Sequence, residues 1–120
     1  MESYRGRVLS FKYAFEGLSA ALKEEPNLKF HVLVALAVLI LSFVLKISQI
    51  DLIIVITLIG LVISVELTNT AIEAIVDSFT EQQHPRAKLA KDVSAAAVFI
   101  MAVTAAIVGI VTFLPYLWIF

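Results

Sequence analysis

The sequence contains no cysteine, and glycine and proline are scarce, with four and three residues in a chain of 120. Without cysteine there is no disulfide framework, no thiolate zinc site and no cysteine nucleophile. The glycines stand singly at positions 6, 17, 60 and 109. Such isolated residues form neither a Walker loop nor a kinase glycine-rich loop. A nucleotide site in this protein therefore has to be built without the common phosphate-binding loops.

Charged residues make up only 16% of the chain, whereas 61% of the residues are hydrophobic and the mean hydropathy is +0.98. A soluble domain of this size does not need so much apolar surface. The apolar residues fill three long segments, and a helix of about 20 residues spans the roughly 30 Å hydrocarbon core of a bilayer. We therefore expect one all-α integral membrane domain over residues 1–120, with transmembrane helices over 28–46, 50–77 and 92–118.

Basic residues are unevenly distributed around these three segments. Eight of the nine Lys and Arg residues lie before or at the start of the first segment, or between the second and the third. The 46–51 connection has only Lys46, and no basic residue follows Lys91. Cytoplasmic loops of membrane proteins carry the excess of basic residues. We therefore predict that the N-terminus and the 78–92 loop are cytoplasmic and that the C-terminus lies outside.

Residues 4–25 have the pattern of an amphipathic surface helix. Apolar residues recur there at spacings of three and four, and the basic residues lie on other faces. Such a helix lies in the cytoplasmic interface, with its apolar stripe toward acyl chains or toward its own bundle. Pro26 is expected to end it. Glu24 and Glu25 then lie where the chain turns into the membrane, although a solvated acidic pair also explains them.

Four polar or acidic side chains interrupt the second apolar stretch at offsets of 0, 3, 7 and 11, namely Glu66, Asn69, Glu73 and Asp77. At about 100° per residue these positions fall within an arc of roughly 80°, so they share one side of a helix. Ionisable residues at membrane depth are costly and usually face a bundle interior or a water-filled cavity. We interpret these four residues, the seam, as a functional site. The alternative is a set of polar contacts that join helices.

The carboxylates of the seam suggest a bound cation, with different roles at different depths. Mg²⁺ prefers oxygen ligands and is commonly held by one or two carboxylates together with substrate phosphates. Glu73 and Asp77 lie nearer the cytoplasmic end, where Glu25 can join them, whereas Glu66 lies deeper. A deep, desolvated carboxylate can accept the proton of a lipid hydroxyl. Positive charge for the phosphates is available from Arg7, Arg86, Lys88 and Lys91. The pattern indicates phosphoryl transfer at a membrane interface.

Two polar residues in or beside the expected 78–91 loop have simpler explanations. His84 precedes Pro85 and has no second metal-binding residue nearby, so a surface loop position accounts for it. Asp92 stands where the third transmembrane helix is expected to begin, and an acid in a first turn complements the helix dipole. Neither residue by itself identifies a site.

Several runs of the sequence resemble the prokaryotic diacylglycerol kinase family. The resemblance rests on residues 65–77, which contain the pattern E-x-x-N-x-x-x-E-x-x-x-D, on His84, and on residues 90–98, 13–18 and 25–27. It covers nearly the whole chain, and this pattern in a membrane helix is highly specific. The Gln82-Gln83-His84-Pro85 segment and the Lys88-x-x-Lys91-Asp92 spacing are more similar to the Gram-positive branch, whose members typically act as undecaprenol kinases.

The resemblance implies an ATP- and Mg²⁺-dependent lipid kinase of the bacterial inner membrane. It implies a homotrimer with active sites between protomers and no nucleic-acid partner. Undecaprenol is the preferred substrate and diacylglycerol the alternative. Matched by position, Glu66 resembles the catalytic base, which Asn69 would orient, and Glu25 and Glu73 resemble the Mg²⁺ ligands. The residues expected to contact the nucleotide are Arg7, Tyr13, Glu25, Glu73, Asp77, His84, Lys91 and Asp92. Arg5 and Arg7 flank Gly6, which aligns with a basic residue of the Gram-negative branch.

A hypothesis of another class is a non-catalytic membrane protein, either an ion channel or an assembly subunit, whose acidic seam lines a polar pathway. Lys91 and Asp92 beside the seam, and Glu25 on the same side, favour the kinase. A channel does not need a cytoplasmic cluster that binds phosphates.

We also expect an obligate oligomer, because three helices are too thin to enclose both a desolvated carboxylate and a nucleotide. The seam would then face lipid unless neighbouring chains covered it. The small residues Ala95, Ala96 and Ala97 are candidates for close contacts between helices of different chains.

Overall fold

The computed structural model describes residues 2–79 and 84–118 and is helical almost throughout. Its elements are α1 (Glu2–Glu24), α2 (Pro26–Val44), α3 (Gln49–Phe79) and α4 (Pro85–Leu117). The helices α2, α3 and α4 are each long and apolar enough to cross a membrane. The expected all-α fold, with three helices long and apolar enough to span a membrane, is thereby confirmed.

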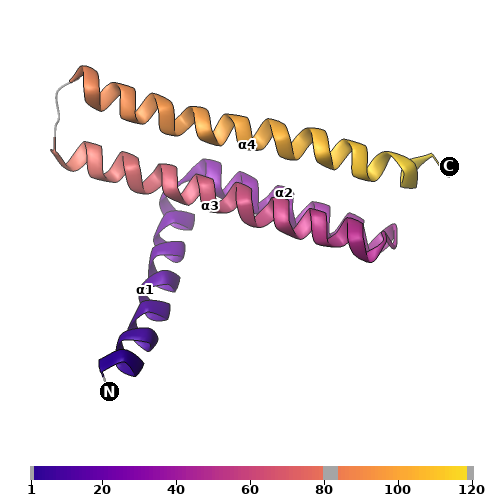
Figure 1. The fold of residues 1–120 in the computed structure, drawn as a ribbon, viewed down its shortest axis with the longest axis horizontal. Coiled ribbons are helices and arrows are strands. Elements are labelled where there is room, and N and C mark those ends of the chain that lie inside the picture. The colour runs from indigo at the N-terminus through magenta and orange to yellow at the C-terminus, as the bar shows by residue number, and fades with distance from the viewer. Residues whose placement is uncertain (1, 80–83, 119–120) are drawn as a thin grey trace.

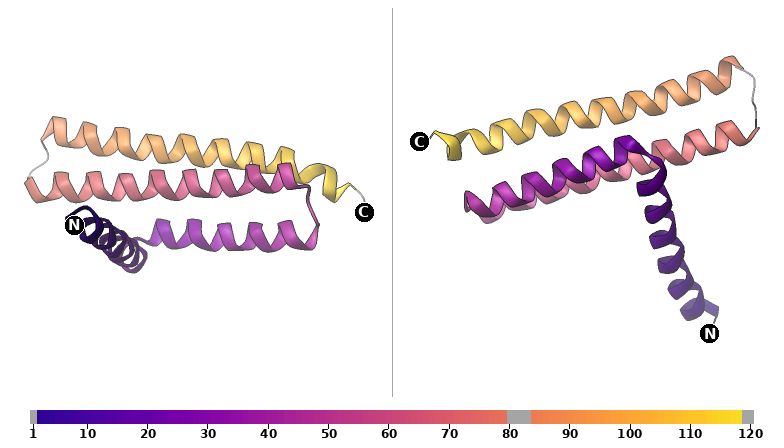
Figure 2. Two further views of the ribbon diagram at one scale, coloured as in Figure 1. Left: turned by 60° about the horizontal axis from the view of Figure 1, so that its bottom comes forward. Right: turned by 180° about the vertical axis from the view of Figure 1, so that it is seen from behind.

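The three apolar helices lie side by side in one layer with α3 in the middle (Figure 2). α3 contacts both α2 and α4, whereas α2 and α4 do not contact each other within the described residues. α1 leaves the layer at a steep angle and touches α2 and α3 only near its C-terminal end (Figure 1). The arrangement leaves one face of α3 exposed between its two neighbours.

Prolines mark the start of two helices. Pro26 and Pro85 each stand in the first turn, and the residues before them, Glu25 and His84, have extended backbone angles. A proline lacks the N–H that a first helical turn does not use, and it forces the preceding residue out of the helical region. The expected end of the N-terminal helix before Pro26 is confirmed.

The loop expected over 78–91 is wrong in its bounds. α3 continues to Phe79 and α4 already begins at Pro85, so the polar residues before Asp92 are helical rather than loop residues. Asp92 therefore lies inside α4 and does not complement its first turn as expected. The polar composition of this segment resembles a loop, but a helix that extends beyond the membrane tolerates polar residues on all sides. Gln82 and Gln83 lie outside the described residues.

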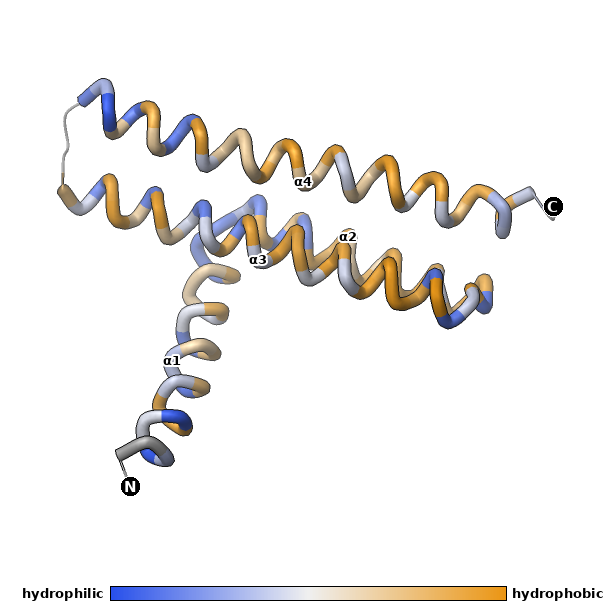
Figure 3. Tube along the Cα trace, viewed as in Figure 1, coloured by the Kyte–Doolittle hydropathy of each residue, from blue (hydrophilic) through white to orange (hydrophobic). Residues whose placement is uncertain are grey.

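α3 and α4 are longer than a bilayer requires. With 31 and 33 residues they extend for about 46 and 50 Å, whereas a hydrocarbon core measures about 30 Å. Hydrophilic residues gather where α4 begins and where α1 joins α2, and the middle of the layer is predominantly hydrophobic (Figure 3). The C-terminal end of α3, which contains Asp77 of the seam, therefore extends beyond the predominantly hydrophobic middle of the layer.

A polar cluster closes the opposite end of the layer, which we call the turn end and define by Ser48, Asp51 and Tyr116. The Tyr116 hydroxyl donates to Asp51 Oδ2 at 2.5 Å and accepts from the Ser48 backbone N–H at 2.9 Å. The Ser48 side chain in turn accepts from the Asp51 N–H at 3.2 Å, as a helix cap does. These bonds attach the C-terminal part of α4 to the start of α3.

Candidate functional site

The seam runs from the buried centre of the layer to its surface. Glu66 is only 1% exposed and is, with Leu28, one of the most fully buried side chains. Further along α3, Asn69 and Glu73 are partly buried and Asp77 is exposed. The four residues thus share one helix face, as the spacing predicts, but they differ sharply in their access to water.

The burial of Glu66 is achieved within a single chain, which corrects the expectation that neighbouring chains must cover it. α2 packs against α3 at this level, where His31 Nε2 lies 3.6 Å from Glu66 Oε2, and Leu28 in the first turn of α2 is completely buried. The packing of helices within one chain is therefore enough to exclude water from this carboxyl group. The burial of Glu66 is no longer an argument for an oligomer.

His31 of α2 is the ionisable neighbour of Glu66. Its Nε2 lies 3.6 Å from Glu66 Oε2, and within the described residues no group donates a hydrogen bond to that oxygen. Buried polar atoms without a partner are rare, and a catalytic role is one of the explanations for them. The sequence reasoning overlooked His31, although an ionisable residue within the first apolar segment is itself a signal.

Asn69 connects the seam to α4 rather than to Glu66. The Ser94 hydroxyl donates to Asn69 Oδ1, and Ser94 is buried between the two helices. In the part of the chain that the structure describes, no hydrogen bond joins the Asn69 and Glu66 side chains. The sequence reasoning treated Ser94 only as a small residue and missed its hydrogen bond.

The two lysines of α4 each pair with an aspartate. Lys91 Nζ lies 2.8 Å from Asp77 Oδ1, and Lys88 Nζ lies 2.5 Å from Asp92 Oδ2. All four side chains are well exposed, at 40% or more, and exposed ion pairs are weak and screened by salt. A polyphosphate can therefore compete for both lysines. The contact between Asp77 and Lys91 joins the end of α3 to the start of α4 only weakly.

Glu25 and Glu73 lie near enough to Glu66 for their charges to act on its carboxyl. Glu25 precedes α2, and its side chain caps no backbone group, so its oxygens are not used by the helix. Within residues 2–79 and 84–118, no three His, Asp or Glu side chains form a ready metal cage. The two carboxylates nevertheless fit Mg²⁺, which accepts few protein oxygens when phosphates and water supply the others. In that role Glu25 and Glu73 would hold the ion.

Three of the expected nucleotide contacts are not gathered around the seam. Arg7 and Tyr13 are exposed on α1, whose N-terminal end points away from the layer (Figure 1). His84 caps α4, with Nδ1 accepting from the Arg86 backbone N–H at 3.1 Å. The structure thus supports a structural role for His84, and it leaves Arg7 and Tyr13 free to meet another molecule.

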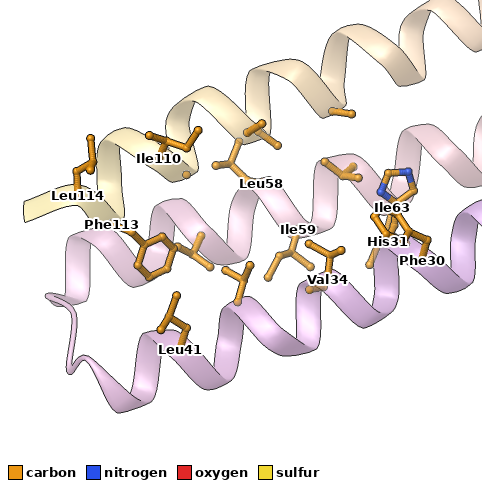
Figure 4. Close-up of a pocket in the computed structure, with 18 of the residues that line it drawn as sticks. Phe30, His31, Val34, Leu41, Leu58, Ile59, Ile63, Ile110, Phe113 and Leu114 are labelled. Carbon is orange, nitrogen blue, oxygen red and sulfur yellow. The ribbon is translucent and has the colours of Figure 1, made fainter. Parts of the chain in front are cut away.

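An apolar groove of about 690 Å³ opens between α2 and α4, with α3 as its floor (Figure 4). On α4 the first part of its wall is formed by the small residues Ala102, Ala105, Ala106 and Gly109, and the rest by larger apolar residues from Ile110 to Leu117. Phe30 and His31 lie at one end of the groove, and Leu114 and Phe113 lie toward the other. His31 also faces Glu66, so one residue of the groove wall lies 3.6 Å from the buried carboxyl group.

Known proteins resemble this chain over most of its length. Residues 12–113 match the family model described as prokaryotic diacylglycerol kinase. An undecaprenol kinase from Bacillus subtilis is 45% identical over 90% of this chain and 88% of its own. Diacylglycerol kinases from Haemophilus influenzae and Escherichia coli K12 are 36% and 33% identical over 85% and 88% of this chain, and over 84% of their own in both cases. With its three helices able to span a membrane and its acidic seam, the chain therefore belongs to the prokaryotic diacylglycerol kinase family and is a lipid kinase of a bacterial membrane.

Proposed function

We propose that this lipid kinase transfers the γ-phosphate of ATP to the hydroxyl of a membrane lipid. The observation that carries the proposal is the buried Glu66, whose Oε2 has no donor among the described residues and lies 3.6 Å from Nε2 of His31, a residue that lines one end of an apolar groove. The groove accommodates a hydrocarbon tail, and its polar end brings a terminal hydroxyl to the carboxyl group. A contact that only joins helices does not need a buried carboxyl group whose oxygen lacks a hydrogen-bond donor.

In this reaction the Glu66 carboxylate accepts the proton of the lipid hydroxyl as its oxygen attacks the γ-phosphorus. The bond between that phosphorus and the bridging oxygen of ADP breaks, and ADP leaves. Positioning and charge stabilisation account for most of the catalysis of phosphoryl transfer. Mg²⁺, when bound, neutralises charge on the phosphates. Glu25 and Glu73 would hold it, and Lys91 with Asp77 and Asp92 would border the nucleotide.

Undecaprenol is the preferred substrate in this proposal, giving undecaprenyl phosphate, and diacylglycerol is the alternative. The relative from Bacillus subtilis is named undecaprenol kinase, and those from Haemophilus influenzae and Escherichia coli are named diacylglycerol kinase. The groove supports either choice, because its wall is almost wholly apolar and recognises hydrocarbon rather than a headgroup.

A direct assay separates the two substrates. Purified protein in mixed micelles is given labelled ATP and Mg²⁺ with undecaprenol or with diacylglycerol, and the phosphorylated lipid is measured. We expect faster transfer to undecaprenol. A higher rate with diacylglycerol would reverse the preference, and phosphorylation of neither lipid would refute the proposed reaction.

The working protein is proposed to be a homotrimer in the inner membrane, with the N-terminus and the α3–α4 connection in the cytoplasm. α1 would lie in the interface as an amphipathic helix. Arg7 and Tyr13 are exposed away from their own seam, and Ala95, Ala96 and Ala97 are exposed on α4, so each is accessible to a neighbouring chain. Contacts through small residues bring helices close together in lipid.

Native mass spectrometry in mild detergent should then show three chains per particle. If sites are shared, mixing an inactive Glu66→Gln chain with an inactive Glu25→Gln chain should restore part of the activity. A monomer with full activity would contradict the trimer.

A further inference from the structure

His31 is the ionisable side chain that the proposed reaction leaves without a role. It lies on α2 with its side chain 17% exposed, and its Nε2 is 3.6 Å from the buried Oε2 of Glu66. The His31 ring also lines one end of the apolar groove (Figure 4). It packs edge-on against the neighbouring Phe30 ring, with 5.9 Å between the two ring centroids. His31 thus stands between the groove and the carboxyl group.

Apart from His31, no side chain among the described residues is in a position to donate a hydrogen bond to Oε2 of Glu66. Within the described residues, Oε2 accepts no hydrogen bond, and the nearby charges of Glu25 and Glu73 repel a carboxylate. The neighbouring polar side chain on α3, Thr70, donates to the Glu66 backbone carbonyl and not to its side chain. Among the described residues, the His31 imidazole is the one basic side chain with a nitrogen that lies within 4 Å of a Glu66 carboxyl oxygen.

We propose that His31 is the positioning residue of Glu66. Its Nε2–H donates to Oε2 and fixes the carboxyl plane, which leaves the second carboxylate oxygen to accept the proton of the lipid hydroxyl arriving through the groove. The separation of 3.6 Å closes to hydrogen-bond length by a small rotation of either side chain, and such contacts often tighten when substrate binds. This inference rests on the proposed function, because it gives His31 a task only if Glu66 is the base.

The first test compares two replacements of His31. His31→Leu removes the N–H donor and keeps an apolar side chain, whereas His31→Gln keeps an N–H donor at a similar distance from the backbone. We expect kcat to fall about tenfold or more in His31→Leu with an unchanged KM for ATP, and most of it to return in His31→Gln. Leu33→Ala, on the same helix but 66% exposed and outside the groove, is the control and should keep its kcat.

The second test asks whether His31 acts through Glu66. In a Glu66→Gln background, adding His31→Leu should cause no further loss, because the group that His31 positions is already gone. The chain has only two histidines, so ring ¹⁵N resonances can be assigned with a single His84→Gln variant. We expect Glu66→Gln to shift the His31 resonances and to leave those of His84 in place.

The outcomes separate this inference from the proposed function. Normal turnover in Glu66→Gln would refute Glu66 as the base, and both proposals with it. If Glu66→Gln is inactive, the His31 inference alone is overturned by any of three results. These are a normal kcat in His31→Leu, a kcat in His31→Gln as low as in His31→Leu, and His31 ¹⁵N resonances that do not shift in Glu66→Gln.

Discussion

The two ends of the helical layer both contain acids, yet they use them in opposite ways. At the turn end, Asp51 receives a hydrogen bond from Tyr116, and Tyr116 also accepts from the Ser48 N–H. At the seam, the more deeply buried Glu66 has one oxygen without a donor among the described residues. Its nearest ionisable partner, His31, lies just beyond hydrogen-bond length.

The difference separates a structural acid from a reactive one. A carboxylate that accepts a short hydrogen bond from its own protein contributes to stability and is unavailable for chemistry. A buried carboxylate with a free oxygen is costly to maintain, and selection keeps it where a substrate completes its contacts. The following experiments test this division, with the largest expected effect first.

Replacing the reactive acid should abolish most of the turnover. Glu66→Gln keeps the size of the side chain and removes its basicity, so we expect turnover to fall by ~10²–10⁴ while ATP affinity changes little. Turnover and nucleotide binding are measured on the purified variant. Glu16→Gln, an exposed acid that pairs with Lys12 on α1, is the control and should stay active. Near-normal turnover in Glu66→Gln would contradict the assignment.

Replacing either proposed metal ligand should raise the Mg²⁺ requirement. Glu25→Gln and Glu73→Gln each remove a charged oxygen from a hard cation that has few protein ligands. We expect the Mg²⁺ concentration for half-maximal activity to rise by at least about tenfold, the lower end of the loss seen even for outer-shell partners. Glu24→Gln, at the exposed neighbouring position, is the matched control. An unchanged Mg²⁺ titration in both variants would place the metal elsewhere.

Filling the groove should weaken lipid binding without affecting the seam. A Cβ added at Gly109 meets no atom within 4 Å, so the space beside this residue is open and Gly109→Leu places a side chain in the groove. Displacing two lipid methylene groups costs about 1.6 kcal/mol, which corresponds to a roughly tenfold higher KM for the lipid. Gly60→Leu is equally unobstructed but lies outside the groove, and its KM should stay unchanged. Equal KM values in the two variants would mean that the tail binds elsewhere.

Disrupting the turn end should affect stability and leave catalysis unchanged. Tyr116→Phe removes the hydroxyl that joins Asp51 and the Ser48 N–H. We expect a loss of about 1–3 kcal/mol in resistance to unfolding by sodium dodecyl sulfate in mixed micelles, with kcat unchanged. Tyr4→Phe, at a position 74% exposed, should not alter stability. A large fall in kcat at wild-type stability would show that the turn end takes part in the reaction.

Much of the fold could be predicted from local patterns. Long apolar runs require helices wherever backbone groups must be satisfied inside a bilayer, so three spanning segments follow from composition and length. The shared face of Glu66, Asn69, Glu73 and Asp77 follows from helical periodicity. The start of α4 at Pro85 was missed, because polarity between Arg86 and Lys91 resembles a loop as much as an extended helix end.

The partners of the site residues could not be predicted in the same way. His31 and Glu66 are far apart in the chain, and only the packing of α2 on α3 brings them within 3.6 Å. The same holds for Ser94 with Asn69 and for Lys91 with Asp77, both of which depend on how α4 lies against α3. Periodicity determines which residues share one helix face, but it contains no information about the rotation or depth of the neighbouring helix.

The sequence by itself determined the helical membrane architecture, the acidic seam and the family, because these depend on local periodicity, hydropathy and a motif within one helix. The tertiary structure decided that one chain buries Glu66, that His31 faces it, and that His31 also lines one end of an apolar groove between α2 and α4. These features depend on contacts between distant segments. Their energies come from side-chain packing across helices, which no single stretch of the sequence contains.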